Sequence, residues 1–189
     1  MAEKDLSLPG LFAAEDKAGR KTVKVYYLDA SALVKLFIDE NGSETLRKHV
    51  KKSVNFCATS FCLGEALGVM KRDYFNKPKA NNYKKYLQKC RGLMVGGLGG
   101  KIEVEEMCIT KGYHFVEWIK EAEAFVGKYK IDFVDALQLV TLLRGRYAYF
   151  SGGSKSILIT ADADLAKAAT EEKVCVWNIL ENQTEPTWK

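Results

Sequence analysis

The stretch VKVYYLDASALVKLF, residues 23–37, joins a short apolar run to a helical pattern through a single aspartate. Residues 23–28 are rich in β-branched and aromatic side chains, which predicts a buried strand. Residues 30–37 predict a helix, with Asp29 or Ser31 near its start. A strand that ends at an acid and passes at once into a helix is the local plan of an α/β protein.

The same alternation of short apolar strands and helices continues along the chain. Further strands are expected at 54–58, 102–106, 157–160 and 174–177, and further helices at 43–51, 59–69, 110–128, 134–147 and 162–171. This pattern predicts an α/β fold with a short parallel central sheet flanked by helices on both faces. We expect residues 22–180 to form this domain, with an N-terminal extension at 1–21 and a frayed C-terminal tail at 181–189.

Four acidic residues, Asp29, Glu65, Asp135 and Asp162, lie in four separate apolar contexts. Two carboxylates about 4 Å apart repel by roughly 4 kcal/mol at an effective dielectric constant near 20, unless a cation neutralises them. Mg²⁺ and Mn²⁺ prefer such oxygen ligands. Glu65 stands out because it lies inside a helical pattern, where a buried charge is costly unless it is paired.

Helix capping is an alternative explanation for the aspartates taken singly. Asp29, and either Asp162 or Asp164, could each cap the helix that follows. Asp132 and Asp135 are three residues apart, as an N-cap and a third-position acid would be. Capping therefore stays open at these positions, whereas it does not explain the acid inside its helix.

Positive charge is concentrated in residues 71–91, which carry eight basic residues and one acid within a chain of net charge +5. Aromatic residues interleave with them. Lysines neutralise phosphates and aromatic faces stack on bases, so this segment is either a solvated pair of helices or a nucleic-acid contact. The candidate RNA contacts are Lys71, Arg72, Lys77, Lys79, Lys84 and Lys85, with Lys35 and Arg144 as further candidates.

Several other classes of site find no support in the sequence. The five cysteines form no Cys-x-x-Cys pair, and the two histidines lie outside every motif. The glycine-rich residues 94–101 fail the Walker pattern at two positions, so we expect a turn there. The first 20 residues lack an apolar signal segment, and no apolar run approaches the ~20 residues of a membrane span, so we expect a soluble, cytoplasmic protein.

Four segments, in this order, resemble the motifs of PIN-domain nucleases. They are YLDASALVK at 27–35, SFCLGEA at 60–66, DALQL at 135–139 and LITADADL at 158–165. The closest resemblance is to the VapC-type ribonuclease toxins of prokaryotes. The resemblance implies a Rossmann-like PIN fold and an acidic pocket that binds Mg²⁺ or Mn²⁺.

By motif, the resemblance assigns Asp29, Glu65, Asp135 and Asp162 as the catalytic and metal-binding acids. It assigns Ser31 and Thr160 as pocket hydroxyls, with Asp132 and Asp164 as second-tier acids.

The implied activity is metal-dependent hydrolysis of RNA by the toxin of a toxin–antitoxin pair. The implied partners are an RNA substrate, a second copy of the chain in a homodimer, and a small antitoxin protein. The alternatives are a housekeeping RNA-processing PIN nuclease and a catalytically inactive module for nucleic-acid binding or assembly.

Overall fold

The computed structural model describes residues 13–15, 19, 21–51, 55–75, 82–97, 102–105, 113–148, 150 and 153–187. Its centre is a five-stranded parallel sheet with the strand order β5-β4-β3-β6-β7. The strands are β3 (Lys24–Leu28), β4 (Phe56–Thr59), β5 (Ile102–Glu105), β6 (Lys155–Thr160) and β7 (Cys175–Asn178). The expected short parallel sheet is therefore confirmed.

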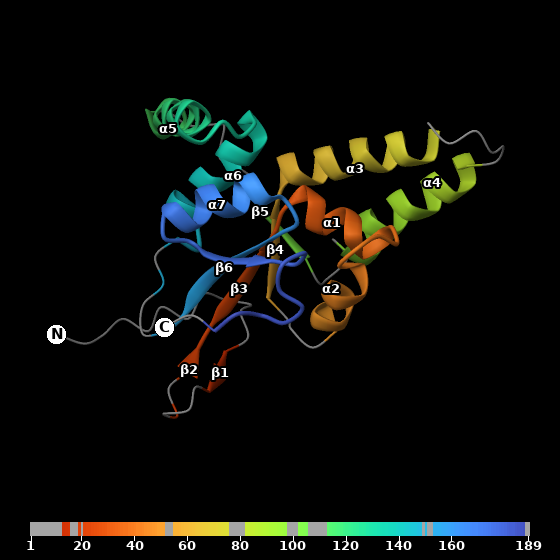
Figure 1. The fold of residues 1–189 in the computed structure, drawn as a ribbon, viewed down its shortest axis with the longest axis horizontal. Coiled ribbons are helices and arrows are strands. Elements are labelled where there is room, and N and C mark those ends of the chain that lie inside the picture. Colours follow the sequence, from red (N-terminus) through yellow and green to blue (C-terminus); the bar gives the residue numbers. More distant parts are fainter. Residues whose placement is uncertain are drawn as a thin grey trace.

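Helices cover both faces of this sheet, as Figure 1 shows. They are α1 (Ala30–Phe37), α2 (Ser43–Val50), α3 (Ser60–Phe75), α4 (Asn82–Arg91), α5 (Tyr113–Tyr129), α6 (Phe133–Arg144) and α7 (Ala163–Glu171). Alternate side chains of β3 enter two separate cores. Tyr26 and Leu28 pack against α1, α2 and α3, whereas Val25 and Tyr27 pack against α5, α6 and α7.

The strand order reverses at the central strand β3, which pairs with β4 on one side and β6 on the other. Leu28 at the end of β3 lies opposite Ile159 near the end of β6. The backbone N–H of Asp29 donates to the carbonyl of Ile159 at 3.2 Å, which ties the two strand ends together. Open α/β sheets bind ligands at such a switch point, beyond the carboxyl ends of the strands.

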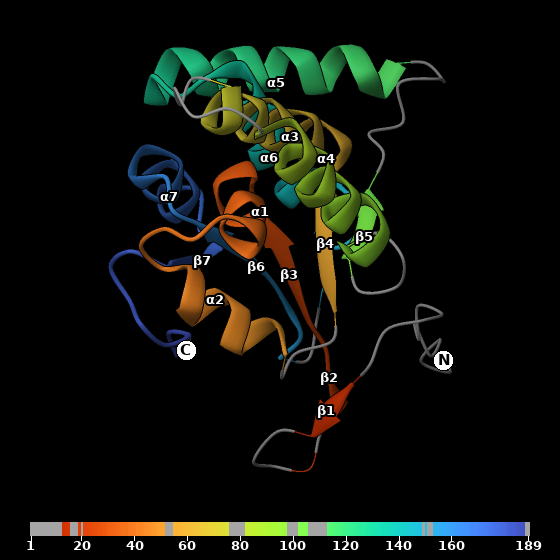
Figure 2. The same cartoon turned by 90° about the vertical axis from the view of Figure 1, so that its right-hand side faces the viewer.

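Described residues on either side of the main sheet also make ordered contacts. Strands β1 (Ala14–Glu15) and β2 (Lys21–Thr22) pair antiparallel and stand apart from the main sheet, as Figure 2 shows. Near the other end, Glu185 accepts hydrogen bonds from Lys24 Nζ at 2.7 Å and Tyr26 Oη at 3.1 Å. Residues 1–12, 16–18 and 20 of the expected extension lie outside the described residues.

The glycine-rich segment forms a π-helical turn at Gly92–Gly97 that continues directly from α4, in place of the simple turn expected. Leu93 within it is fully buried in the core formed with α1, α2 and α3. A Cβ at Gly92 would lie 3.4 Å from the Phe37 ring, so a small residue suits this close approach. None of the helices in the described ranges is long and apolar enough to cross a bilayer.

Alanine substitutions at two glycines should change the free energy of unfolding in opposite directions. A Cβ at Gly145 would lie 2.5 Å from the Thr141 carbonyl and 2.6 Å from Glu105 Oε1, so Gly145→Ala should lower the free energy of unfolding by about 1–3 kcal/mol. Gly127 lies within α5 facing open space, so Gly127→Ala should raise it by roughly 0.5–1 kcal/mol. Urea denaturation of both variants checks this, and destabilisation by Gly127→Ala would contradict it.

Candidate metal centre

Asp29 is the most buried acid of the proposed site, with 3% of its surface exposed. It caps α1 by accepting from the backbone N–H of Ser31 through Oδ1. Its second oxygen, Oδ2, accepts from Ser31 Oγ at 2.8 Å and from the Thr160 hydroxyl. Burial raises the pKa of Asp29, and the hydrogen bonds from Thr160 and Ser31 act in the opposite direction.

Both hydroxyls are themselves fixed by the loop that follows β6. Ser31 Oγ accepts from the backbone N–H of Ala161 at 2.8 Å, and Thr160 Oγ1 accepts from the backbone N–H of Asp162 at 2.9 Å. Each hydroxyl therefore relays a backbone dipole to the carboxylate of Asp29. The sequence placed Ser31 and Thr160 in the pocket, and the structure brings both into contact with this one acid.

Asp162 follows β6 and caps α7. Its Oδ1 accepts from the backbone N–H groups of Asp164 and Leu165, both at 2.8 Å. Its Oδ2 accepts no hydrogen bond from the described part of the chain, and the side chain is exposed. One oxygen therefore serves the helix while the other faces outward, where a cation could reach it.

Asp135 and Asp132 both sit at the start of α6. Asp132 is the N-cap and accepts from the backbone N–H of Asp135 at 2.8 Å. Asp135 lies in the first turn and is half-buried, and its pKa is raised to about 8. Burial is the main cause, followed by the charges of Asp132, Asp29, Asp162 and Glu65.

Glu65 approaches from the other side, on α3. Its side chain is half-buried, and burial raises its pKa, assisted by the charges of Asp132, Asp29 and Asp162. Arg72, two helical turns along α3, is the basic residue that lowers it. The four predicted acids therefore come from α1, α3, α6 and α7 and influence one another electrostatically, with Asp132 as a fifth member.

Neighbouring acidic charges raise the pKa values of Asp29, Glu65 and Asp135, but the carboxylates do not form a closed coordination shell. Among the described residues, no group of three or more His, Cys, Asp or Glu side chains is close enough to hold a metal ion as it stands. The two observations agree because charges interact over several ångströms, whereas Mg²⁺–oxygen bonds are about 2.1 Å long. The donors are all carboxylate oxygens, which fits Mg²⁺ or Mn²⁺.

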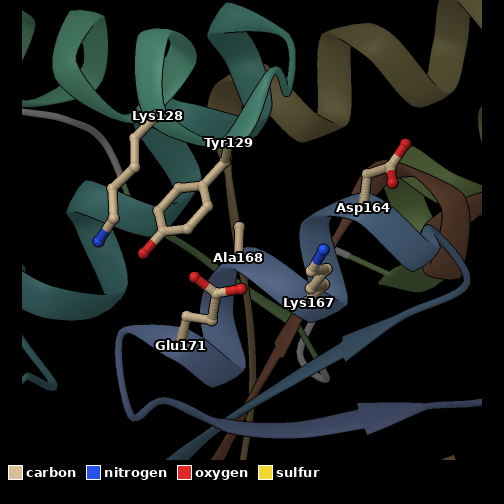
Figure 3. A pocket seen from close by; sticks show the side chains of 6 residues that line it. All are labelled: Lys128, Tyr129, Asp164, Lys167, Ala168 and Glu171. Atoms are coloured by element: carbon tan, nitrogen blue, oxygen red, sulfur yellow. The ribbon is translucent and has the colours of Figure 1, made fainter.

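Asp164 has a different environment from the other acids. It lines a small cavity of about 160 Å³ between the end of α5 and α7. Figure 3 shows Lys128 and Tyr129 of α5 facing Lys167, Ala168 and Glu171 of α7 across this cavity. Asp164 is not among the acids whose charges contribute most to the raised pKa values of Asp29, Glu65 and Asp135; those acids are Asp29, Glu65, Asp132 and Asp162.

Two of the candidate RNA contacts are already paired within the chain. Lys35 is buried, and its Nζ lies 2.6 Å from Glu40 Oε1. Arg144 donates to both carboxylate oxygens of Glu121, at 3.2 and 3.1 Å. Lys71, Arg72, Lys84 and Lys85 are exposed on α3 and α4, whereas Lys77 and Lys79 lie outside the described residues.

The sequence interpretation overlooked a buried amide beside the acids. Gln138 lies one turn after Asp135 on α6 and is 1% exposed. A glutamine inside the apolar run of that helix was the available signal, since an apolar residue would suit a purely structural position.

Comparison with known proteins supports the fold. One solved structure, PAE2754 from Pyrobaculum aerophilum, matches with a TM-score of 0.52 and 14% identity over 80% of this chain and 82% of that one. VapC20 from Mycobacterium tuberculosis, a sarcin–ricin loop cleaving toxin, matches with a TM-score of 0.52 and 15% identity over 76% and 94%. The α/β fold is thus of the PIN type, as expected.

No protein-family model and no curated protein matches the sequence. At identities of 14–15%, the structural likeness establishes the fold and leaves the activity to be argued from the site.

The raised pKa of Asp135 predicts a pH dependence of stability. Its folded-state pKa of about 8 exceeds the ordinary value of 3.8, so its stabilising contribution is complete below pH 3.8 and is lost as the pH rises to about 8. The difference between a pKa of about 8 and one of 3.8 corresponds to roughly 6 kcal/mol before solvent screening of this half-buried group, so metal-free Asp135→Asn should gain less than that, increasingly as the pH rises from 4 to 8. Chemical denaturation in EDTA at several pH values measures this difference.

Asp164→Asn is the matched control, because it neutralises an exposed acid on the neighbouring helix. It controls for the loss of one acidic charge near the same helix ends. A pH-independent effect of Asp135→Asn would show that Asp135 is not held in a charge-disfavouring environment.

Proposed function

We propose that this protein is a Mg²⁺- or Mn²⁺-dependent ribonuclease, and that it acts as the toxin of a toxin–antitoxin pair. The observation that carries the proposal is the convergence of Asp29, Glu65, Asp135 and Asp162 at the switch point of a PIN-type sheet. Carboxylates raised in pKa by burial and by one another need a cation to become fully ionised. The VapC20 likeness supports a nuclease in particular.

The chain's own groups divide the work of hydrolysis. Asp29, Asp135 and Asp162 would hold the cation, with Asp29 kept in place by the Ser31 and Thr160 hydroxyls. A bound divalent cation supplies Lewis-acid chemistry, acidifying water and neutralising phosphate charge. Glu65, on the opposite helix, either joins the ligands or accepts a proton from the attacking water. In-line attack leaves a 5′-phosphate and a 3′-hydroxyl.

The alternative chemistry, in which the RNA 2′-hydroxyl attacks with histidine help, finds no support at this site. The His49 ring packs edge-on against Tyr26 and Trp177, with ring centroids 4.7 and 4.6 Å away. That position is in the α1–α3 core and not among the acids.

The exposed end of the α3–α4 pair offers an RNA contact. The two helices lie side by side and project beyond the sheet in Figure 1. Arg72 lies between Glu65 and Phe75 on α3, and Phe75 is about 15 Å along the helix from Glu65 at 1.5 Å per residue. Phe75 and Tyr83 are 52% and 59% exposed with centroids 6.5 Å apart, so bases of a single strand could stack there.

The proposed partners follow from the same surfaces. A small antitoxin protein would silence the nuclease by placing a basic side chain among the acids, where it would replace the cation's charge. We also propose a homodimer, whose mass light scattering would measure. Expression that arrests growth, relieved by loss of an acid, would separate the toxin role from a housekeeping RNA-processing role.

Asp162→Asn is the sharpest test of the nuclease site. Asparagine caps helices as well as aspartate, so α7 should persist while the charge is lost. We expect RNA cleavage to fall at least about 100-fold, as it should in wild type with EDTA. Mapping the ends of the wild-type products should show 5′-phosphates.

Asp164→Asn, two residues away, is the matched control and should retain near-wild-type cleavage. Asp29→Asn should also be inactive, but it places an amide against the Ser31 and Thr160 hydroxyls, so circular dichroism should first establish that it folds. Normal cleavage by Asp162→Asn, or cleavage that survives EDTA, would refute the proposed site.

The α3–α4 surface predicts a specific salt dependence. Changing both Lys84 and Lys85 to Gln should weaken binding of single-stranded RNA to the uncleaving Asp162→Asn protein. The slope of log K against log salt should become shallower by about 0.7 for each phosphate that the variant no longer neutralises. Lys48→Gln on α2, an exposed lysine outside this surface, is the control. An unchanged slope in the double variant would place the RNA elsewhere.

A further inference from the structure

A buried amide joins the two helices that carry Glu65 and Asp135. Gln138 Oε1 accepts a hydrogen bond from Cys62 Sγ at 3.1 Å. Cys62 precedes Glu65 by three residues on α3, and Gln138 follows Asp135 by three residues on α6. Both hydrogen-bonded residues therefore lie one helical turn from an acid.

The other end of the same amide is unsatisfied. Gln138 is 1% exposed, and its Nε2 has no hydrogen-bond partner in the described part of the chain. Leaving a buried N–H donor unpaired costs about 1–3 kcal/mol. Native proteins rarely retain such a group, so its presence suggests a partner that arrives later.

The amide lies between the helical turns that carry Glu65 and Asp135, because its bonded partner Cys62 is one turn from Glu65 on α3 and Gln138 itself is one turn from Asp135 on α6. Burial raises the pKa of the Cys62 thiol to which the amide is bonded, and the charges of Asp29, Glu65 and Asp135 add to this rise. An amide turned by 180° would place an additional acceptor in the unpaired position, which is unfavourable beside anions.

The separated carboxylates and the unpaired Gln138 donor both describe the protein without a bound cation. Within the described ranges, the carboxylates are not close enough to coordinate an ion, and a buried donor beside them is unpaired.

We propose that Gln138 is a positioning residue of the metal centre, whose Nε2 donates to a carboxylate oxygen once a divalent cation draws the acids together. The inference rests on the proposed metal-dependent function. Cys62 holds the amide in place through Oε1, so that Nε2 is oriented before the cation binds. Gln138 thereby contributes to cation affinity without touching the cation.

Thermal unfolding with and without Mn²⁺ tests this in wild type and Gln138→Leu. Leucine removes both the unpaired Nε2 donor and the Oε1 acceptor of Cys62, so each variant is compared with itself, in the presence and absence of Mn²⁺. The Mn²⁺ affinity of Gln138→Leu, obtained from the dependence of Tm on Mn²⁺ concentration, should be about 10–100-fold weaker. Gln138→Met, unbranched like glutamine, serves if the leucine variant folds poorly.

Gln88→Leu makes the same substitution at an exposed position on α4 and should change neither the metal-free stability nor the Mn²⁺ affinity. Unchanged Mn²⁺ affinity in Gln138→Leu overturns the proposal. If wild type itself shows no response to Mn²⁺, the metal-dependent function fails too, whereas a response that both proteins share defeats the Gln138 inference alone.

Discussion

The buried carboxylate of Asp29 is the constraint on which the rest of the site depends. It sits where β3 ends beside β6, and it remains acceptable there because the Ser31 and Thr160 hydroxyls donate to it and each hydroxyl accepts a backbone N–H from the loop after β6. A buried anion without such donors would cost several kilocalories per mole. The same bonds fix the position of Asp162, so one electrostatic requirement shapes two strand ends and the starts of two helices.

Capping and clustering are two uses of the same acids and do not exclude each other. Asp29, Asp132 and Asp162 each cap a helix, as the capping interpretation of the sequence allowed. The α1, α6 and α7 N-termini lie near one another, so the capping acids converge, and their repulsion is lessened by the partial positive charge of each helix end. Glu65 lies inside α3 and lacks this compensation. Burial is the main cause of the raised pKa values of Asp29, Glu65 and Asp135, and the charges of neighbouring acids add to it.

The sequence predicted those parts of the molecule that local patterns determine. Apolar strands followed by acids predicted the parallel sheet and the positions of Asp29 and Asp162, because strand ends in such sheets share one edge. The sequence could not predict the ion pairs of Lys35 with Glu40 and of Arg144 with Glu121. The first depends on the geometry of the loop after α1, and the second on the packing of α5 against α6. The influence of Asp132 on Glu65 could not be predicted either, because it depends on α3 bringing Glu65 across from α6.

The cluster and its buried surroundings explain why the fold would tolerate such an expensive arrangement. Carboxylates that raise one another's pKa are a source of instability in the absence of a cation, and the unpaired Gln138 amide adds to it. Under the proposed function, both costs would fall when a divalent ion neutralised the acids, because the ion's charge and the amide's hydrogens would then have partners. An ion poorly suited to carboxylate oxygens would relieve these costs less. The relief would therefore favour a small, hard cation such as Mg²⁺.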